Sequence, residues 1–262
     1  MRLGIFQCVG AAGDPVANLE LLNRAAASAA ERGVDLLVLP EMFLTGYHIG
    51  DQTLALAEAE DGASAARAAE VASSHGVALM YGYPERSGDA VYNAALVFDA
   101  AGNRLANFRK CHLFGPEEER LFAAGDRLVV FELGGLRVAP LVCYDVEFPE
   151  AVRALALAGA DVVAVPTALM EPYDPVPMSV VPARAYENLL FVAYANRCGA
   201  ERGMRYVGLS TIAAPDGSVL ARADANEGLI TADLDPAAYE KYKRENAHLT
   251  ARRPELYARP VD

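Results

Sequence analysis

Three residues that could act together in catalysis each follow a segment that the sequence predicts to be a buried strand. Glu41 comes after the apolar run 34–39, and Lys110 comes after a predicted strand over 104–108. Cys143 lies at the end of another predicted strand. Sites in α/β proteins form at strand ends, because the sheet fixes the backbone while the loop exposes the side chain. These three positions are therefore candidates for one site.

The chemistry of the three side chains is complementary. A carboxylate directly after an apolar run is poorly solvated, so the pKa of Glu41 should rise toward the range that suits a general base. The Lys110 ammonium carries three donors and could stabilise a developing oxyanion. Cys143 lies at a predicted strand-to-helix junction, where the helix N-terminus and a nearby cation would lower the pKa of its thiol. Cys143 is therefore the candidate nucleophile.

Each of these residues also has an explanation that involves no chemistry. Glu41 could be an exposed acid at a strand end, Lys110 a solvated lysine, and Cys143 an inert core residue. The explanation is weakened for Lys110, because the other two lysines of the chain lie near its C-terminus and the rest of its basic residues are arginines. Cys8 and Cys198 fit the role of inert core cysteines better than Cys143 does.

The composition is that of a globular protein and excludes several classes of function. Of the 262 residues, 53% are hydrophobic and 22% are charged, and the formal net charge is −12. A chain this acidic is a poor candidate for binding nucleic acid or an anionic membrane surface. No cysteine pair or histidine spacing predicts a metal site, and no glycine-rich loop predicts a nucleotide cofactor. No apolar run is long enough to span a bilayer, so we expect a cytoplasmic protein.

The elements that must position the candidate residues alternate between strands and helices. After a first strand, Asp14-Pro15 predicts the start of a helix that Gly33 would end. A second helix and three strands follow, and a similar succession begins after Cys143. Residues 111–126 are predicted to form a charge-rich loop, and the C-terminal tail to be extended. We interpret residues 1–262 as a single α/β domain in which helices cover two sheets.

Taken together, the order and spacing of these residues resemble the nitrilase (carbon–nitrogen hydrolase) superfamily. The matching segments are 39–47 around Glu41, 108–114 around Lys110, and 143–150, which begins at Cys143. Shorter matches are Arg184-Ala185-Tyr186-Glu187-Asn188, Asn196-Arg197, Gly208-Leu209-Ser210 and Arg252-Arg253-Pro254-Glu255-Leu256-Tyr257. The resemblance therefore covers nearly the whole chain.

The resemblance implies a fold and a set of partners. The fold would be a four-layer αββα sandwich with two central mixed β-sheets. Two subunits would pack helix against helix into a homodimer, or into a higher homo-oligomer. Members of the superfamily need no metal and no organic cofactor, so the expected partner is a small-molecule amide substrate and not a nucleic acid or a membrane.

The same resemblance implies catalytic roles. Glu41 would accept the thiol proton of Cys143, whose thiolate attacks an amide carbonyl carbon. The Lys110 ammonium and the backbone N–H of Tyr144 would hold the oxyanion. Family members often carry a second glutamate eight residues after the lysine; here it is Glu118, which would orient the amide or the water, with either neighbouring glutamate as an alternative. Water activated by the general base would then cleave the thioester.

The residues after the cysteine distinguish branches of the superfamily. True nitrilases usually continue with Trp-Glu, whereas Tyr144-Asp145 is typical of amidase-like branches. We therefore predict a cysteine-dependent amidase that hydrolyses a small aliphatic or amino-acid-type amide to a carboxylate and ammonia through a thioester. The alternatives are an N-carbamoyl amide hydrolase of the same fold and, less favoured, a true nitrilase. A binding protein that has kept the fold is a third alternative, against which the intact triad argues.

Loops beside the triad must supply the substrate pocket. The candidates, chosen because they flank Glu41, Cys143 and a predicted strand end, are Tyr47, Tyr144, Ala168, Met170, Glu171 and Pro172. No arginine or acidic residue can be assigned from the sequence to a charge on the substrate. The sequence therefore predicts a small amide without determining its charge.

Overall fold

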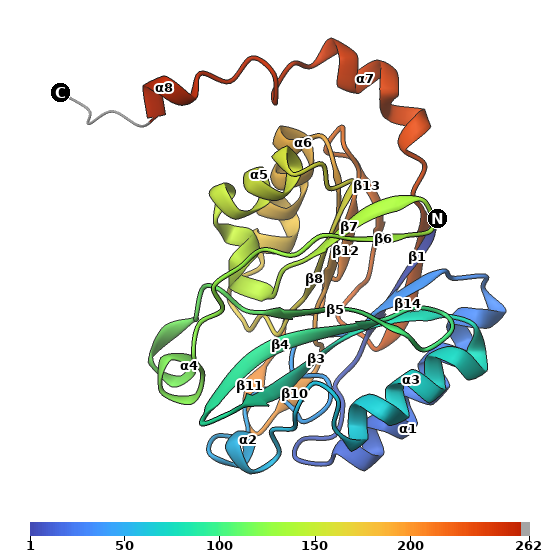
Figure 1. Cartoon of the computed structure of the whole chain (residues 1–262), viewed down its shortest axis with the longest axis vertical. Coiled ribbons are helices and arrows are strands. Elements are labelled where there is room, and N and C mark those ends of the chain that lie inside the picture. Colours follow the sequence, from blue (N-terminus) through green and yellow to red (C-terminus); the bar gives the residue numbers. More distant parts are fainter. Residues whose placement is uncertain (258–262) are drawn as a thin grey trace.

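The computed structural model describes residues 1–257, and two mixed six-stranded sheets form its centre (Figure 1). The first sheet has the strand order β14-β1-β2-β3-β4-β5, and the second has the order β13-β12-β9-β8-β7-β6. In the first sheet β1, β2 and β3 are parallel neighbours, and in the second β7, β8 and β9 are. Antiparallel strands flank both parallel sets. The two sheets therefore share the same pattern of strand directions.

The strands of the first sheet are β1 (Arg2–Gln7), β2 (Leu36–Val38), β3 (Ala78–Ser87), β4 (Ala90–Phe98), β5 (Arg104–Arg109) and β14 (Gly228–Asp233). Those of the second are β6 (Phe131–Leu133), β7 (Leu136–Pro140), β8 (Val162–Pro166), β9 (Phe191–Ala195), β12 (Thr211–Ala213) and β13 (Val219–Arg222). A short hairpin, β10 (Ala200–Glu201) and β11 (Met204–Arg205), lies apart from both sheets.

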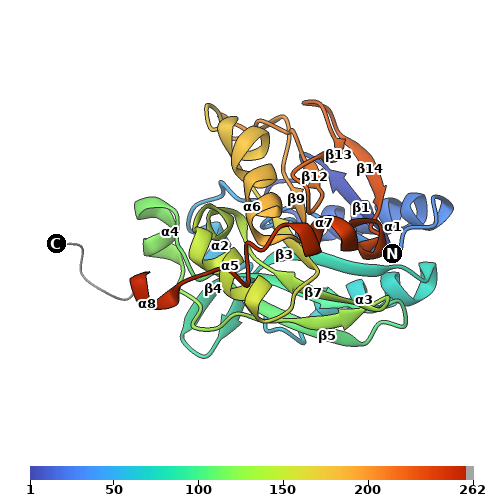
Figure 2. The same cartoon turned by 90° about the horizontal axis from the view of Figure 1, so that it is seen from above.

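Helices cover the outer face of each sheet (Figures 1 and 2). The first sheet is covered by α1 (Pro15–Glu31) and α3 (Ala63–His75), and the second by α5 (Pro149–Leu157) and α6 (Val181–Asn188). One apolar cluster lies under each helix pair and a third lies between the sheets. This layering confirms the predicted αββα sandwich with two central mixed sheets.

The remaining helices are short. They are α2 (Gln52–Ala55), α4 (Gly115–Leu121), α7 (Glu240–Glu245) and α8 (Pro254–Tyr257), together with a π-helical turn over Val176–Val180 and 3₁₀ turns over Cys143–Glu147 and Pro236–Tyr239. In the described part of the chain, no helix has the length and apolar character needed to cross a membrane.

The central strands are apolar throughout because both of their faces are covered. Every residue of β2 and β8 is buried, with helices on one side of its sheet and the opposite sheet on the other. Continuous apolar runs are typical of parallel strands in such a position. Of the candidate residues, Glu41 follows β2, Lys110 follows the edge strand β5, and Cys143 follows β7.

Local signals explain where α1 begins and where α1 and α3 end. The Asp14 carboxylate accepts a hydrogen bond from the Ala17 N–H at 3.0 Å, and Pro15 occupies the first helical position. After α1, Gly33 has a φ of 65°, and after α3, Gly76 adopts the left-handed conformation as the C-cap. Glycine adopts this conformation without the steric cost that a side chain would add.

Two predicted irregular segments contain helices. Residues 111–126 were expected to form a loop, but α4 lies within them, with a proline near its start, two glutamates in its first turn and Arg120 in its last. These charges complement the helix dipole. The tail was expected to be extended, but α8 lies within it. Seven and four residues are too few to show a helical period. The rest of the predicted tail, residues 258–262, lies outside the described residues.

Candidate active site

A buried ammonium group lies at the centre of the site, between two carboxylates. Lys110 follows β5 and is fully buried. Its Nζ donates to Oε1 of Glu41 at 2.8 Å and to Oε1 of Glu118 at 2.7 Å. Burial opposes the charged form of Lys110, but the two carboxylates outweigh this and raise its pKa. Because an ammonium has three donors, one N–H remains for a further acceptor.

Glu41 is fully buried three residues after β2. Its Oε1 accepts a hydrogen bond from Asn93 of β4 at 2.7 Å as well as the one from Lys110. Its Oε2 is buried and has no hydrogen-bond partner among the described residues. Burial raises the pKa of Glu41, and the Glu118 charge adds to this rise although Lys110 opposes it. The direction expected from the sequence is therefore confirmed, and one oxygen is available to accept a proton.

Glu118 enters the site from α4. Its Oε1 accepts a second hydrogen bond from the Tyr47 hydroxyl at 2.8 Å, and its Oε2 accepts one from the Phe114 N–H at 2.8 Å. Among the three adjacent glutamates, Glu118 is the buried one. Glu117 is half exposed beside His48, and Glu119 is exposed. The helical turn directs Glu118 inward and separates it from its neighbours.

Cys143 begins the 3₁₀ turn Cys143–Glu147, which follows β7 after a two-residue link, and it has a φ of 48°. A positive φ is uncommon for a residue with a side chain and is found at functional sites. Burial and the Glu41 charge raise the pKa of the thiol well above its ordinary value, against the opposing effects of Lys110 and a hydrogen bond with the Ala168 backbone. This corrects the sequence expectation of a lowered thiol pKa. The thiol is therefore neutral at rest and needs a base.

Asp145 fixes the turn that carries Cys143. It is fully buried, and its Oδ2 accepts the Val142 N–H at 3.1 Å. Its Oδ1 accepts the backbone N–H of His112 at 2.9 Å and that of Cys111 at 3.2 Å, and it lies 2.7 Å from the His112 ring nitrogen Nδ1. One carboxylate thus ties the cysteine turn to the segment that directly follows Lys110.

Arg197 holds the segment that carries Glu41. It is fully buried, and its guanidinium donates to the backbone carbonyl oxygens of Glu41 at 3.1 Å, Met42 at 2.7 Å and Val9 at 2.6 Å. Met42 has a φ of 50°. Gly82 of β3 lies against this segment, where a Cβ would collide with the Met42 backbone nitrogen. The segment around Glu41 is thus held on both sides.

Cys143 opens onto a cavity of about 230 Å³. The cavity is lined by Tyr47, Phe114, Cys143, Tyr144, Glu147, Ala168, Leu169, Met170 and Tyr173. The structure thus brings four of the predicted pocket residues to the cysteine. The side chain of Glu171, by contrast, is half exposed and pairs with Arg205 at 3.4 Å, and Pro172 is exposed; neither lines the cavity. These two residues lie beyond the wall, because the chain turns outward after Met170.

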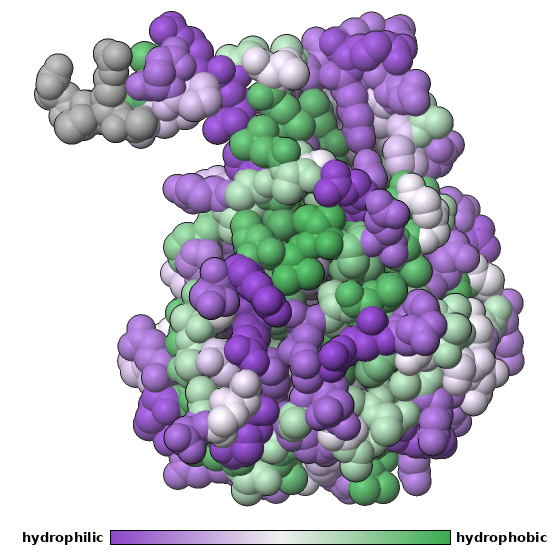
Figure 3. All heavy atoms as spheres, in the orientation of Figure 1, coloured by the Kyte–Doolittle hydropathy of each residue, from purple (hydrophilic) through white to green (hydrophobic). Residues whose placement is uncertain are grey.

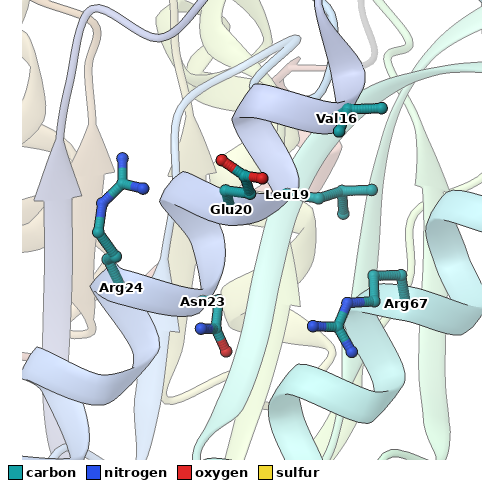
Figure 4. A pocket seen from close by; sticks show the side chains of 6 residues that line it. All are labelled: Val16, Leu19, Glu20, Asn23, Arg24 and Arg67. Atoms are coloured by element: carbon teal, nitrogen blue, oxygen red, sulfur yellow. The ribbon is translucent and has the colours of Figure 1, made fainter.

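Other hollows in the described part of the chain lack this chemistry. One of about 430 Å³ lies between α1 and α3, in the helix layer of the first sheet (Figure 4). It is lined by Val16, Leu19, Glu20, Asn23, Arg24 and Arg67, none of them a nucleophile. Among residues 1–257, no cluster of His, Cys, Asp and Glu is placed to hold a metal ion.

Several contributors were missed in the sequence. Asn93 was hidden in a strand, although a polar residue within an apolar run was a signal for it. The sequence pointed to Asp145 only through a matching segment and the Tyr144-Asp145 pair, and to Arg197 only through a matching segment, because their partners come from distant parts of the chain. Phe114, Leu169 and Tyr173 reach the cavity through loops whose paths no sequence pattern predicted.

Comparisons with known proteins agree with this geometry. The family model described as "Carbon-nitrogen hydrolase" matches residues 2–244. A Pseudomonas protegens protein named "Hydrolase in pqqF 5'region" is 50% identical, over 98% of this chain and 90% of its own. An (R)-stereoselective amidase from Pseudomonas sp. is 36% identical, over 97% of this chain and 92% of its own.

A solved amidase from Nesterenkonia sp. superposes with a TM-score of 0.90 at 38% identity, covering 98% of this chain and 95% of its own. A variant of that amidase carries the acetamide moiety of fluoroacetamide, added covalently at its active-site cysteine.

We predict that Asp145→Asn slows alkylation of Cys143 by iodoacetamide at least tenfold. The asparagine side chain has the size of aspartate but lacks the charge that accepts the backbone N–H groups of Val142, His112 and Cys111. Hydrogen bonds to charged groups are worth about 1.5–3 kcal/mol. Peptide mapping by mass spectrometry measures the rate. Asp161→Asn is the matched control, since the Asp161 carboxylate also accepts a backbone N–H, that of Arg137 at 3.0 Å. Arg137 lies near the start of β7, whereas Cys143 follows the end of that strand. Equal rates in both variants would contradict the prediction.

Proposed function

Because the chain belongs to the carbon–nitrogen hydrolase family, we propose that it is a cysteine-dependent amidase that converts a small aliphatic or amino-acid-type amide to a carboxylate and ammonia. The observation that carries this proposal is the buried Glu41–Lys110–Glu118 cluster beside a cysteine that opens onto a small cavity. The covalent adduct on the cysteine of the similar Nesterenkonia amidase supports a thioester route.

The first step needs a base because the Cys143 thiol is neutral. Glu41 is the acceptor, through the oxygen that has no partner among the described residues. As the proton moves to Glu41, the sulfur attacks the amide carbonyl carbon and the C=O electron pair moves onto oxygen. Since burial raises the pKa values of both groups, no free thiolate needs to accumulate before the attack.

The tetrahedral oxyanion would have two donors. One is the remaining N–H of Lys110, and the other is the backbone N–H of Tyr144, which lies in the first turn of the 3₁₀ helix, where such groups lack an intrahelical acceptor. Removing one donor of this kind typically costs about 3 kcal/mol of transition-state stabilisation. The C–N bond then breaks, and ammonia leaves with the proton held by Glu41.

The second half-reaction regenerates the thiol. Glu41 accepts a proton from a water molecule as the water oxygen attacks the thioester carbonyl carbon. The carbon–sulfur bond then breaks to release the carboxylic acid product. The proton returns from Glu41 to the sulfur. Glu118 positions the substrate amide or the water through its contacts with Lys110 and Tyr47. Amide cleavage is favoured over nitrile cleavage by Tyr144-Asp145, and N-carbamoyl compounds remain the alternative substrates.

We predict that the protein releases ammonia from short amides and that Cys143→Ala reduces this release at least a thousandfold, because the acyl acceptor is lost. A panel of short amides, nitriles and N-carbamoyl compounds, assayed for ammonia, ranks the substrate classes. Cys198→Ala, which removes a buried thiol outside the cavity, is the control and should keep full activity. Ammonia release that persists in Cys143→Ala would contradict the mechanism.

We predict that kcat/KM falls as the pH drops through the raised pKa of Glu41, since only the ionised carboxylate accepts the thiol proton. Glu118→Gln should move this acid limb to lower pH, because the Glu118 charge helps to raise the pKa of Glu41. Glu119→Gln changes an exposed neighbour on the same helix and should leave the limb in place. An acid limb that moves to higher pH in Glu118→Gln would contradict this assignment.

We also propose that residues 1–262 act as a single cytoplasmic domain and that the active form is a homodimer. All four cysteines are free, as suits a reducing compartment. A cleft of about 820 Å³ lies between α5, α6 and the C-terminal arm (residues 240–257), lined by three large exposed side chains, Leu157, Tyr186 and Tyr257.

The surface around this cleft favours a second copy of the chain as its occupant. The arm runs outward from the body (Figure 1), and hydrophobic side chains gather on this face over the region of α5 (Figure 3). Arg153 of α5 lines the cleft and has a buried guanidinium nitrogen with no partner among the described residues. Exposed apolar patches of this kind mark protein interfaces, and the helix-to-helix packing implied by the family resemblance would cover this one.

We predict that the protein is dimeric by size-exclusion chromatography with light scattering and that Leu157→Asp shifts it to the monomer. A carboxylate placed there would be desolvated in the interface. Val219→Asp is the control, since Val219 is also an exposed apolar residue but lies on β13. A native chain that runs as a monomer, or a Leu157→Asp variant that stays dimeric, would argue for another surface.

A further inference from the structure

One charged side chain lines the cavity in the described part of the chain, and the reaction outlined above does not use it. Glu147 ends the 3₁₀ turn that Cys143 begins, and both residues line the same cavity. Its side chain is half-buried, and within residues 1–257 its carboxylate has no hydrogen bond and no ion pair. A carboxylate that faces a cavity without a partner is available to a ligand.

The nearest guanidinium is engaged elsewhere. Arg184 donates to the backbone carbonyl oxygens of Val146 at 2.9 Å and Glu147 at 2.6 Å, and to the carboxylate of Glu187 at 2.9 Å. It thus holds the backbone of the turn and leaves the Glu147 side chain free of a direct bond. Burial raises the pKa of Glu147, and the charge of Arg184 opposes this rise without reversing it.

Aromatic rings form much of the cavity wall beside Glu147. Phe114 and Tyr144 meet edge to face with centroids 5.2 Å apart, and Phe114 and Tyr173 do so at 6.0 Å. All three rings line the cavity. Ring faces attract cations, most strongly where water is excluded. A carboxylate together with three rings therefore suits an ammonium group.

Within residues 1–257, the cavity wall offers no cationic side chain to a carboxylate on the substrate. No arginine or lysine is among the described residues that line it. Lys110 is paired with both Glu41 and Glu118, and the charges of this trio sum to −1 when all are ionised. The net charge of the whole chain, −12, has the same sign. A carboxylate on the substrate would be repelled here, whereas a protonated amine would be attracted.

We propose that Glu147, Phe114, Tyr144 and Tyr173 form an ammonium-binding subsite, so that the preferred substrates are small amides that also carry a protonated amine. This inference rests on the proposed amidase function and specifies its substrate class. A 3₁₀ helix rises about 2 Å per residue, so the backbone at Glu147 lies about 8 Å along the turn from Cys143. The amine would therefore be separated from the amide carbonyl by only a few bonds.

Pairs of equal-sized substrates test the subsite. Glycinamide is compared with propionamide, and β-alaninamide with butanamide, at about pH 7, where the amines are largely protonated. We expect kcat/KM for the cationic member of at least one pair to exceed that of its neutral partner at least tenfold. Succinamate, which carries a carboxylate, should be hydrolysed more slowly than butanamide. The readout is the ratio of kcat/KM for the cationic amide to kcat/KM for its neutral partner, measured within each variant.

Two variants test whether Glu147 causes the preference for cationic amides. Glu147→Gln should reduce the cationic-to-neutral ratio to near one, and Glu147→Lys should favour succinamate instead. Glu150→Gln is the matched control, because Glu150 lies three residues further on, is exposed and does not line this cavity; its ratio should equal that of the native chain. If neutral amides are cleaved and Glu147→Gln does not change the cationic-to-neutral ratio of kcat/KM, the subsite is overturned while the proposed amidase function stands.

A second measurement does not depend on turnover. Butylammonium should protect Cys143 from iodoacetamide more strongly than butanol does, and this difference should disappear in Glu147→Gln. If the native chain hydrolyses no amide, the proposed function fails, and this protection decides the subsite alone. Equal protection by the two compounds, or protection that persists in Glu147→Gln, would overturn the subsite.

Discussion

The ammonium of Lys110, buried between the carboxylates of Glu41 and Glu118, is the interaction on which the rest of the site depends. Two carboxylates this close could not both be ionised without a cation between them, and burying an unpaired charge is costly. The cluster also joins three separate elements, since its members follow β2, follow β5 and belong to α4. Burial, followed by the charge of Glu41 in this cluster, raises the pKa of the nearby Cys143 thiol.

The cluster and Cys143, the nucleophile that we propose, come from different sheets. Glu41, Lys110 and Glu118 belong to the half of the chain that builds the first sheet, whereas Cys143 follows a strand of the second. Their alignment depends on groups that bridge the halves. Asp145 ties the cysteine turn to the segment after Lys110, and Arg197 ties the end of β9 to the backbone around Glu41. Both are fully buried and both bind backbone groups, which restricts sliding of one sheet over the other.

Much of the fold and of the candidate site could be predicted from local sequence patterns. Apolar runs, helix caps and glycine positions predicted the elements of both sheets, and the polar residues at strand ends predicted the site. The pKa of Glu41 was predicted in the right direction because its burial follows from the apolar run before it. The pKa of Cys143 was predicted in the wrong direction, because its turn is visible in the sequence whereas its burial and the charge of Glu41 are not. The partners of Asn93, Asp145 and Arg197 also lie across sequence gaps that local patterns do not span.

The first sheet is completed by the last strand among residues 1–257. β14, residues 228–233, pairs antiparallel with β1, residues 2–7, from Arg2 opposite Asp233 to Gln7 opposite Gly228. Until β14 arrives, β1 is an edge strand whose backbone groups face outward. During synthesis the ribosome must therefore make residues 1–233 before this edge can be covered, and exposed edges of nascent sheets are prone to mispairing. The protein is thus committed to a long interval of incomplete folding, in which a chaperone that shields an open strand would protect it.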